Sequence, residues 1–166
     1  MLSENAAAMR GCRFVRSAVG EANVVAKMQR LKAPFGGEGN GGVIDARIPS
    51  YGRDALAGLA HIVALIGSGR EPLSAWVASI APTVMVKKTA HNISPAQMSE
   101  AVERARHLLQ GAVLDTTDGY HLSGNMPGGK KAWVHLRSSN TEPLVRIIAE
   151  AGSKAEVESL IAGLGL

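Results

Sequence analysis

Apolar side chains recur every three or four positions in several segments of this chain, which is the spacing of one helix face. In residues 21–31 the repeat is formed by Val24, Val25, Met28 and Leu31. The same spacing predicts further helices at residues 3–10, 53–66, a short stretch after Pro72, 94–111 and 153–164. Ser94-Pro95-Ala96-Gln97 and Ser153–Glu156 each have the residues of a capping box, which marks where a helix begins.

Shorter apolar runs between these segments indicate strands and divide the chain in two. They lie at residues 13–15, 43–44, 84–89, 113–117, 120–123, 133–137 and 144–149. Asp118-Gly119 is typical of a two-residue hairpin turn, and Ala81-Pro82 marks a domain boundary. We therefore expect an α/β region with a mixed sheet over residues 1–81. A small α+β domain is expected over residues 82–166, with a four-stranded, mainly antiparallel sheet and two helices.

Charge and composition narrow the possible partners. The chain has 166 residues, of which 46% are hydrophobic, and a net charge of +4. Its basic doublets, Lys87-Lys88 and Lys130-Lys131, have no aromatic residues interleaved with them, unlike a nucleic-acid groove. We therefore expect no nucleic-acid partner, whereas a small anion held by a few arginines fits the charge balance.

The cysteine content and the hydropathy of the chain indicate where in the cell it is located. A single cysteine, Cys12, excludes an internal disulfide, and its apolar-basic surroundings predict a buried structural thiol. Apolar stretches are short and broken by Gly, Lys or Pro, so we expect no membrane partner. No secretory signal is visible in residues 1–10, and a reducing cytoplasm is the simplest location.

The first loop with candidate chemistry is Gly36–Gly42, which has five glycines in seven residues. Such a loop lets backbone approach a ligand closely, while Glu38 and Asn40 provide its functional side chains. A carboxylate and a carboxamide suit neighbouring sugar hydroxyls. Composition alone leaves a plain connecting loop as an equal alternative. The spacing fits neither a P-loop nor a dinucleotide-binding fingerprint.

The second loop, residues 137–146, has an arginine at each end. Alternation places Val134 and Leu136 on one strand face, and therefore Arg137 on the other. Arg146 lies likewise opposite Val145 and Ile147, so pairing of the two strands would bring both arginines to one side of a sheet. The loop adds the polar side chains of Ser139, Asn140 and Thr141. This combination favours a phosphate site over a polar turn.

The groups that would carry out a reaction are missing from the sequence. There is no D-x-D cluster for a divalent metal and no Ser, His or Asp combination of an activated nucleophile. Taken alone, the chain is predicted to hold a ligand without transforming it.

Both loops resemble those of the α-D-phosphohexomutase superfamily, which includes phosphoglucosamine mutases and phosphomannomutases. The segment 19–24 with Phe35–Gly42 resembles the sugar-recognition region of the third domain. The segment 137–143 with Arg146 is similar to the phosphate-binding loop of the fourth domain. Order and spacing agree over nearly the whole chain. Residues 1–81 then correspond to the latter part of domain three, and residues 82–166 to domain four.

The resemblance implies a function for an intact enzyme and roles for this part of it. The family interconverts sugar 6- and 1-phosphates through a bisphosphorylated sugar, with a phosphoserine and a Mg²⁺-binding loop in the first two domains. Neither motif is in this chain. Glu38 and Asn40 would contact sugar hydroxyls, whereas the phosphate not being transferred would be held by Arg137, Ser139, Asn140, Thr141 and Arg146. This chain would contain no catalytic residue and no metal ligand.

The partners implied are a hexose phosphate and the missing N-terminal domains of the same polypeptide. The incomplete domain could also self-associate through an unpaired sheet edge. Asn40, Gly42 and Asn140 depart from the commoner bacterial pattern, which leaves the hexose open, with glucosamine phosphate favoured over mannose or glucose phosphate. The alternative function is a free-standing phosphosugar- or anion-binding module. A serine loop and an acidic metal loop in the upstream coding sequence would distinguish the two, and RNA binding is a weaker third hypothesis.

Overall fold

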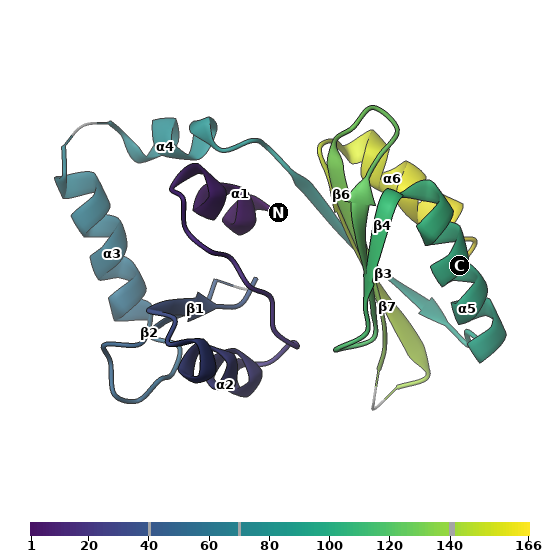
Figure 1. Cartoon of the computed structure of the whole chain (residues 1–166), viewed down its shortest axis with the longest axis horizontal. Helices are drawn as coiled ribbons and strands as arrows, with labels where there is room; N and C mark the ends of the chain where they lie inside the picture. The colour runs from purple at the N-terminus through teal and green to yellow at the C-terminus, as the bar shows by residue number, and fades with distance from the viewer. Residues whose placement is uncertain (40, 70, 140–141) are drawn as a thin grey trace. The chain divides into compact units, whose positions relative to one another are not determined.

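The computed structural model describes residues 1–39, 41–69, 71–139 and 142–166. It divides into two compact units, coloured along the chain in Figure 1. One unit is Phe14–Ser79, here called the glycine-loop unit. The other combines Ile80–Leu166 with Met1–Arg13 and is called the sheet unit. No helix in the described ranges has the length and hydropathy needed to cross a bilayer.

The glycine-loop unit is built on a small hairpin. Its elements are α2 (Glu21–Leu31), β1 (Phe35–Gly37), β2 (Val43–Asp45), α3 (Ala55–Gly67) and α4 (Leu73–Ser79). The strands β1 and β2 are antiparallel, with Phe35 opposite Asp45, so this unit has no mixed sheet over its described residues. Each of the two strands has three residues.

Helix boundaries in this unit follow local signals. Helix α2 has the predicted bounds and is followed by the C-cap residue Lys32, which adopts φ 52°. The Asp54 carboxylate accepts a hydrogen bond from the Ala57 backbone N–H at 2.9 Å and so caps α3. The apolar repeat of α3 correctly predicts a helix, but its side chains are exposed, with Leu56 at 77%. Among the described apolar residues of this unit, Met28 and Ile44 are the buried ones.

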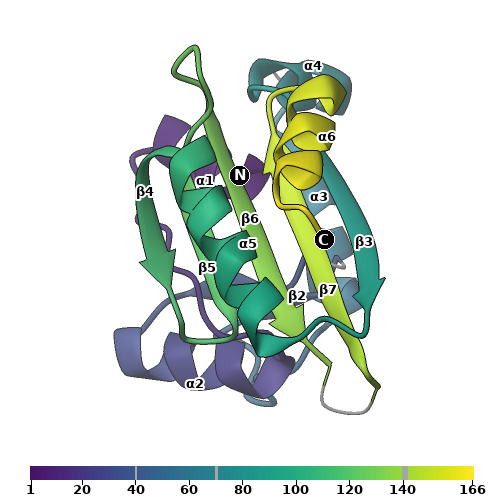
Figure 2. The same ribbon diagram turned by 90° about the vertical axis from the view of Figure 1, so that its right-hand side faces the viewer.

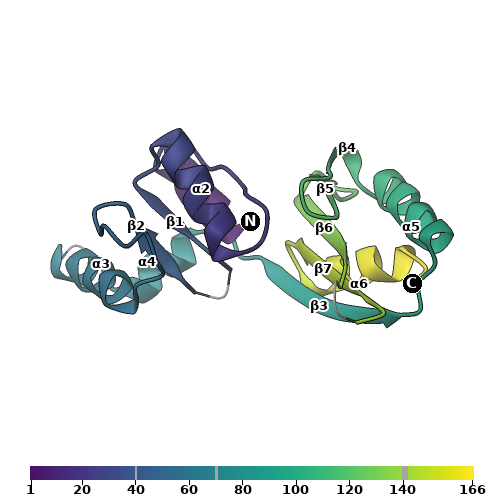
Figure 3. The ribbon, with the colours of Figure 1, turned by 90° about the horizontal axis from the view of Figure 1, so that it is seen from below.

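The sheet unit contains a five-stranded antiparallel sheet with two helices on one face, as Figures 2 and 3 show. The sheet order is β3-β7-β6-β5-β4. Its strands are β3 (Val84–His91), β4 (Gln110–Asp115), β5 (Tyr120–Asn125), β6 (Lys131–Ser138) and β7 (Leu144–Ala151). Its helices are α1 (Leu2–Met9), α5 (Pro95–Leu108) and α6 (Lys154–Gly163). The core between the sheet and helices α5 and α6 includes Leu122, Val134, Leu136 and Ile147 of the sheet and Leu160 of α6.

The α+β class is confirmed, with one strand more than the four predicted. All five apolar runs predicted as strands in this region take part in the sheet, because the first of them, β3, pairs with β7 along its whole length, from Val84 opposite Ala151 to His91 opposite Leu144. The capping box at Ser94 is also confirmed, since Ser94 and Gln97 each accept a hydrogen bond from the other's backbone N–H.

Three local expectations are wrong. Residues 13–15 form no strand, because three residues without a pairing partner cannot build a ladder. Cys12, next to this irregular segment, is exposed rather than buried. The hairpin turn after β4 is longer than two residues: β4 ends at Asp115, whose carboxylate accepts the Thr117 backbone N–H at 2.8 Å and draws the chain into a wider loop.

Candidate functional site

Arg137 and Arg146 lie directly opposite each other on neighbouring strands. Their Cα atoms are register partners between β6 and β7, and Thr89 of β3 is the next partner beyond Arg146. These three side chains therefore form one row on the sheet face that α5 and α6 do not cover. Two cations opposite one another on a sheet repel, with Cβ atoms about 5 Å apart, unless an anion lies between or beside them. The alternation argument for this pair is thus confirmed in its geometry.

One carboxylate partly neutralises this row. Asp118, in the loop before β5, has its Oδ1 3.1 Å from Arg137 Nε. The carbonyl oxygen of Asp118 also contacts His135 Nε2 on the same face. Sequence reasoning used Asp118 only as a turn residue, and it also overlooked Thr89. The strand alternation that identified the arginines would have identified Thr89, whereas nothing in the sequence places Asp118 beside Arg137.

The loop between the arginines is closed by backbone hydrogen bonds. The Ser139 N–H donates to the Leu144 carbonyl at 2.9 Å, and the Asn92 N–H donates to the Pro143 carbonyl at 3.2 Å. Asn140 and Thr141 lie outside the described residues. An open hollow of about 180 Å³ beside this loop is lined by Asn92, Ile93, Ser138, Ser139, Glu142, Pro143, Leu144 and Val145. Neither arginine lines this hollow. An anion held by both arginines must therefore bind on the sheet face that carries Arg137, Arg146 and Thr89.

The glycine loop is seated against helix α2. A Cβ on Gly36 would collide with Met28 Sδ and lie 2.9 Å from Val24 Cγ1. A Cβ on Gly37 would collide with the carbonyl oxygen of Gly42, where the loop returns. These two glycines therefore allow the loop to pack closely against α2 and against its own returning backbone. This packing favours a loop of defined conformation over a flexible connecting loop. Asn40 lies outside the described residues.

Glu38 occupies the turn of this loop. Its backbone N–H donates to the Gly42 carbonyl at 3.1 Å, and its carbonyl accepts the Gly41 N–H at 3.1 Å. The side chain is 18% exposed, and its Oε2 lies 3.6 Å from Nη1 of Arg53. Sequence reasoning missed Arg53, because its partner is fifteen positions away and in a different element.

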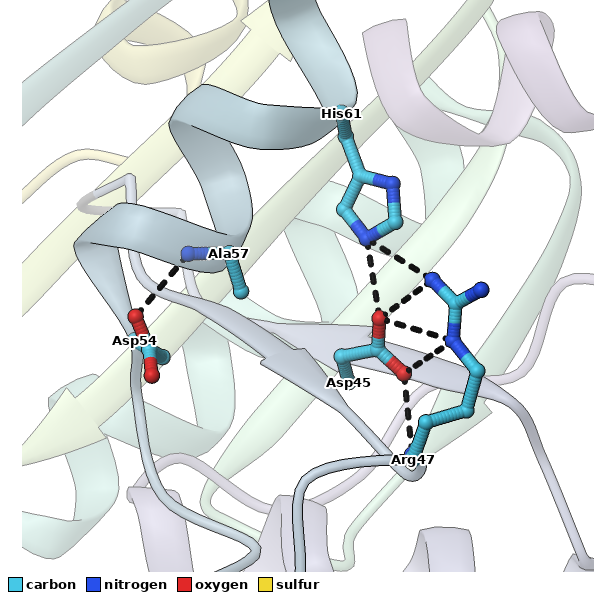
Figure 4. A network of polar contacts seen from close by, with 5 residues as sticks. All are labelled: Asp45, Arg47, Asp54, Ala57 and His61. Carbon is cyan, nitrogen blue, oxygen red and sulfur yellow. Dashed lines mark hydrogen bonds and ion pairs between the residues drawn. The ribbon is translucent and has the colours of Figure 1, made fainter. Parts of the chain in front are cut away.

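Asp45, at the far end of the hairpin from the glycine loop, is the centre of the network in Figure 4. Arg47 donates to its carboxylate from the backbone N–H at 2.9 Å and from Nε and Nη2, the last at 2.6 Å. His61 Nε2 of α3 lies 2.9 Å from Oδ2. The pKa of Asp45 is held well below its usual value by these hydrogen bonds. The largest contribution comes from the Arg47 side chain, followed by the Arg47 backbone N–H and by His61. The network ties α3 to β2.

Asp45 should therefore make the glycine-loop unit acid-sensitive. A carboxyl whose pKa is lower in the folded state stabilises that state above its unfolded pKa of about 4, and this contribution is lost as the pH falls below that value. We expect Asp45→Asn to destabilise the unit at neutral pH. In acid, the free energy of unfolding of this variant should depend less steeply on pH, because up to about one fewer proton is taken up on unfolding. Unfolding monitored through the Ile44 amide resonance between pH 7 and pH 2 measures this.

The matched control is Glu71→Gln, which removes an exposed carboxylate from the same unit. It should leave the acid transition close to that of the unaltered chain. An Asp45→Asn protein with an unchanged acid transition would contradict the role of the network.

The residues described do not fit a metal ion. Within those ranges no three His, Cys, Asp or Glu side chains converge as ligands. Asp45 and His61 lie in contact, but the Arg47 guanidinium already occupies the Asp45 carboxylate. The Mg²⁺ implied by the resemblance would therefore need ligands from outside these residues.

Comparison with known proteins agrees with both loops. The family model for the phosphoglucomutase/phosphomannomutase alpha/beta/alpha domain III matches residues 1–84, and the model for the C-terminal domain matches residues 95–164. The chain belongs to the phosphoglucomutase/phosphomannomutase family. The resemblance seen in the two loops is thereby confirmed.

Relatives within this family are much longer than the chain. A phosphoglucomutase/phosphomannomutase of Thermococcus kodakarensis is 28% identical, over 96% of this chain and 34% of its own length. Phosphoglucosamine mutase of Paramagnetospirillum magneticum is 30% identical, over 92% and 31%. A probable phosphoglucosamine mutase of Methanocella arvoryzae is 32% identical, over 90% and 33%. The chain thus spans about a third of the length of these curated relatives.

Solved structures of the family share the fold. A phosphoglucomutase/phosphomannomutase family protein of Burkholderia thailandensis matches with a TM-score of 0.69 at 23% identity, covering 95% of this chain and 32% of that structure. A phosphoglucomutase of Paramecium in an open form matches with a TM-score of 0.61 at 14% identity, covering 96% and 34%.

Proposed function

We propose that this chain is the sugar- and phosphate-binding part of a phosphohexomutase that interconverts hexose 6-phosphate and hexose 1-phosphate. The observation that carries the proposal is the register pairing of Arg137 with Arg146 on the sheet face opposite α5 and α6. Two opposed guanidinium groups, with the hydroxyl of Thr89 next in the row, suit the charge and the oxygen geometry of a phosphate.

The division of labour follows from the chemistry of each loop. The arginine row holds the phosphate that is not being transferred, with Ser139, Asn140 and Thr141 as further donors. Glu38 and Asn40 contact hydroxyl groups of the sugar. The rest of the intact protein donates one phosphoryl group to the sugar and takes one back, so that the sugar is isomerised without net consumption of phosphate. Mg²⁺ and the phosphoserine belong to that remaining part, and the location is cytoplasmic.

Glucosamine phosphate is the favoured substrate. Two of the three relatives described above carry the name phosphoglucosamine mutase, the third being named for glucose and mannose phosphates. A titration of the purified chain with glucosamine 6-phosphate, mannose 6-phosphate and glucose 6-phosphate tests this preference. We expect glucosamine 6-phosphate to bind most tightly of the three.

Turnover by the isolated chain is the second part of the test. We expect no conversion of glucosamine 6-phosphate to glucosamine 1-phosphate, because the chain supplies no phosphoryl donor, and measurable conversion would contradict this assignment of roles. The alternative is a free-standing phosphosugar- or anion-binding module without catalysis. A serine loop and an acidic metal loop in the upstream coding sequence would exclude it.

A further inference from the structure

Arg53 is fixed in place by a second carboxylate. Its backbone N–H donates to Glu21 Oε1, and its Nε donates to Glu21 Oε2, both at 2.8 Å. These bonds from the backbone and side chain of Arg53 hold the pKa of Glu21 below its usual value. Because Glu21 begins helix α2, the clamp joins the segment before α3 to the start of α2. The guanidinium is therefore oriented before any ligand arrives.

The residues around Arg53 reinforce this position. Tyr51 adopts φ 46°, a left-handed turn, and the Asp54 N–H donates to the Val43 carbonyl at 2.9 Å. Arg53 is thus held between a turn and a bond to strand β2. From there its Nη1 lies 3.6 Å from Glu38 Oε2. This distance is too long for a hydrogen bond, so the contact is electrostatic and leaves the Glu38 oxygens able to accept from another donor.

We infer that Arg53 is a positioning residue for Glu38 and sets the preference for hexose phosphate over bare phosphate. The inference rests on the proposed function, since it assumes that Glu38 contacts the sugar. Glu21 orients the guanidinium, and the guanidinium holds the Glu38 carboxylate in a fixed direction from the glycine loop. Inorganic phosphate has no hydroxyl-bearing ring for Glu38 to contact, so its affinity does not depend on Arg53.

The test compares two ligands on the full 166-residue chain by calorimetric titration, with glucosamine 6-phosphate and inorganic phosphate as probes. For Arg53→Gln we expect the affinity for glucosamine 6-phosphate to fall about tenfold, the value of one hydrogen bond to a charged group. The affinity for inorganic phosphate should stay unchanged, because the arginine row belongs to the sheet unit. Glu21→Gln, which releases the clamp, should weaken the hexose phosphate in the same selective way.

Two further variants separate positioning from folding. Arg53→Lys keeps the charge near Glu38 and should recover part of the lost affinity. Arg30→Gln removes an exposed arginine of the same unit and should change neither ligand. Equal losses for both ligands, or no loss for either, would overturn the inference while leaving the proposed function intact. If the unaltered chain binds inorganic phosphate but no hexose phosphate, the proposed function falls and the inference with it.

Discussion

Arg146→Gln should weaken binding of inorganic phosphate to the chain about ten- to a hundredfold, the range for one lost charge-assisted pair. Arg146 is exposed and faces Arg137 across β6 and β7, so its guanidinium is available to an anion. Arg137→Gln should weaken phosphate binding at least as much, because it also removes the cation that lies between the Asp118 carboxylate and the anion. Arg146→Lys should recover only part of the affinity, since an ammonium group cannot make a bidentate contact.

The control for this prediction is Lys87→Gln. Lys87 is an exposed cation on β3, opposite Ile148 of β7, and therefore on the same sheet face two positions from Thr89. If phosphate binds between the arginines, removing Lys87 should have a small effect that disappears in higher salt. Equal losses for Lys87→Gln and Arg146→Gln, measured by titration, would indicate general electrostatic attraction in place of a site.

Leu136→Ala should destabilise the sheet unit by about 2–5 kcal/mol. Its side chain is 0% exposed and lies in the core that α5 and α6 cover. Removing it leaves a cavity that neighbouring core side chains can fill only in part. Unfolding of the full chain in denaturant, followed through tryptophan fluorescence of Trp133 on the same strand, measures the loss of stability.

A matched pair of valines tests whether burial causes the effect. Val134 is 0% exposed on β6, whereas Val113 is 64% exposed on β4 of the same sheet. Val134→Ala should cost roughly 2 kcal/mol, and Val113→Ala should stay within about 0.5 kcal/mol. Similar losses for the two valines would show that the core lies elsewhere.

The parts of the fold that could be predicted are those with a strong local signal. The bounds of helix α2 agree with the prediction to the residue, because its apolar positions repeat at one period. The start of α5 followed from the capping box at Ser94. The strand predicted at residues 13–15 is absent, because so short an apolar segment has no measurable period. The exposure of α3 could not be predicted either, since amphipathic spacing identifies a helix without identifying what covers it.

The candidate site also has features that could be predicted from the sequence and features that could not. The shared face of Arg137 and Arg146 followed from the two-residue repeat of strands, which needs only the sequence. The contacts of Glu38 with Arg53 and of Asp45 with His61 join segments separated by fifteen and sixteen positions. Such pairs depend on how a turn brings the chain back, and no propensity of a single residue contains that information. Binding roles for Glu38, Ser139, Arg137 and Arg146 stay predictions, as do those for Asn40, Asn140 and Thr141.

The two outer strands of the sheet have a consequence for how the chain behaves in a crowded solution. An open sheet edge offers unpaired backbone groups to any passing strand and so invites polymerisation. Strand β3 has Lys87 and Lys88 on this edge, and charged lysines repel a second copy that approaches in register. At the other edge, the register of β4 with β5 shifts between Gln110 and Val113, which breaks the regular ladder. The basic doublet on β3 and the irregular register of β4 thus disfavour edge-to-edge pairing of this sheet with the same sheet of a second copy.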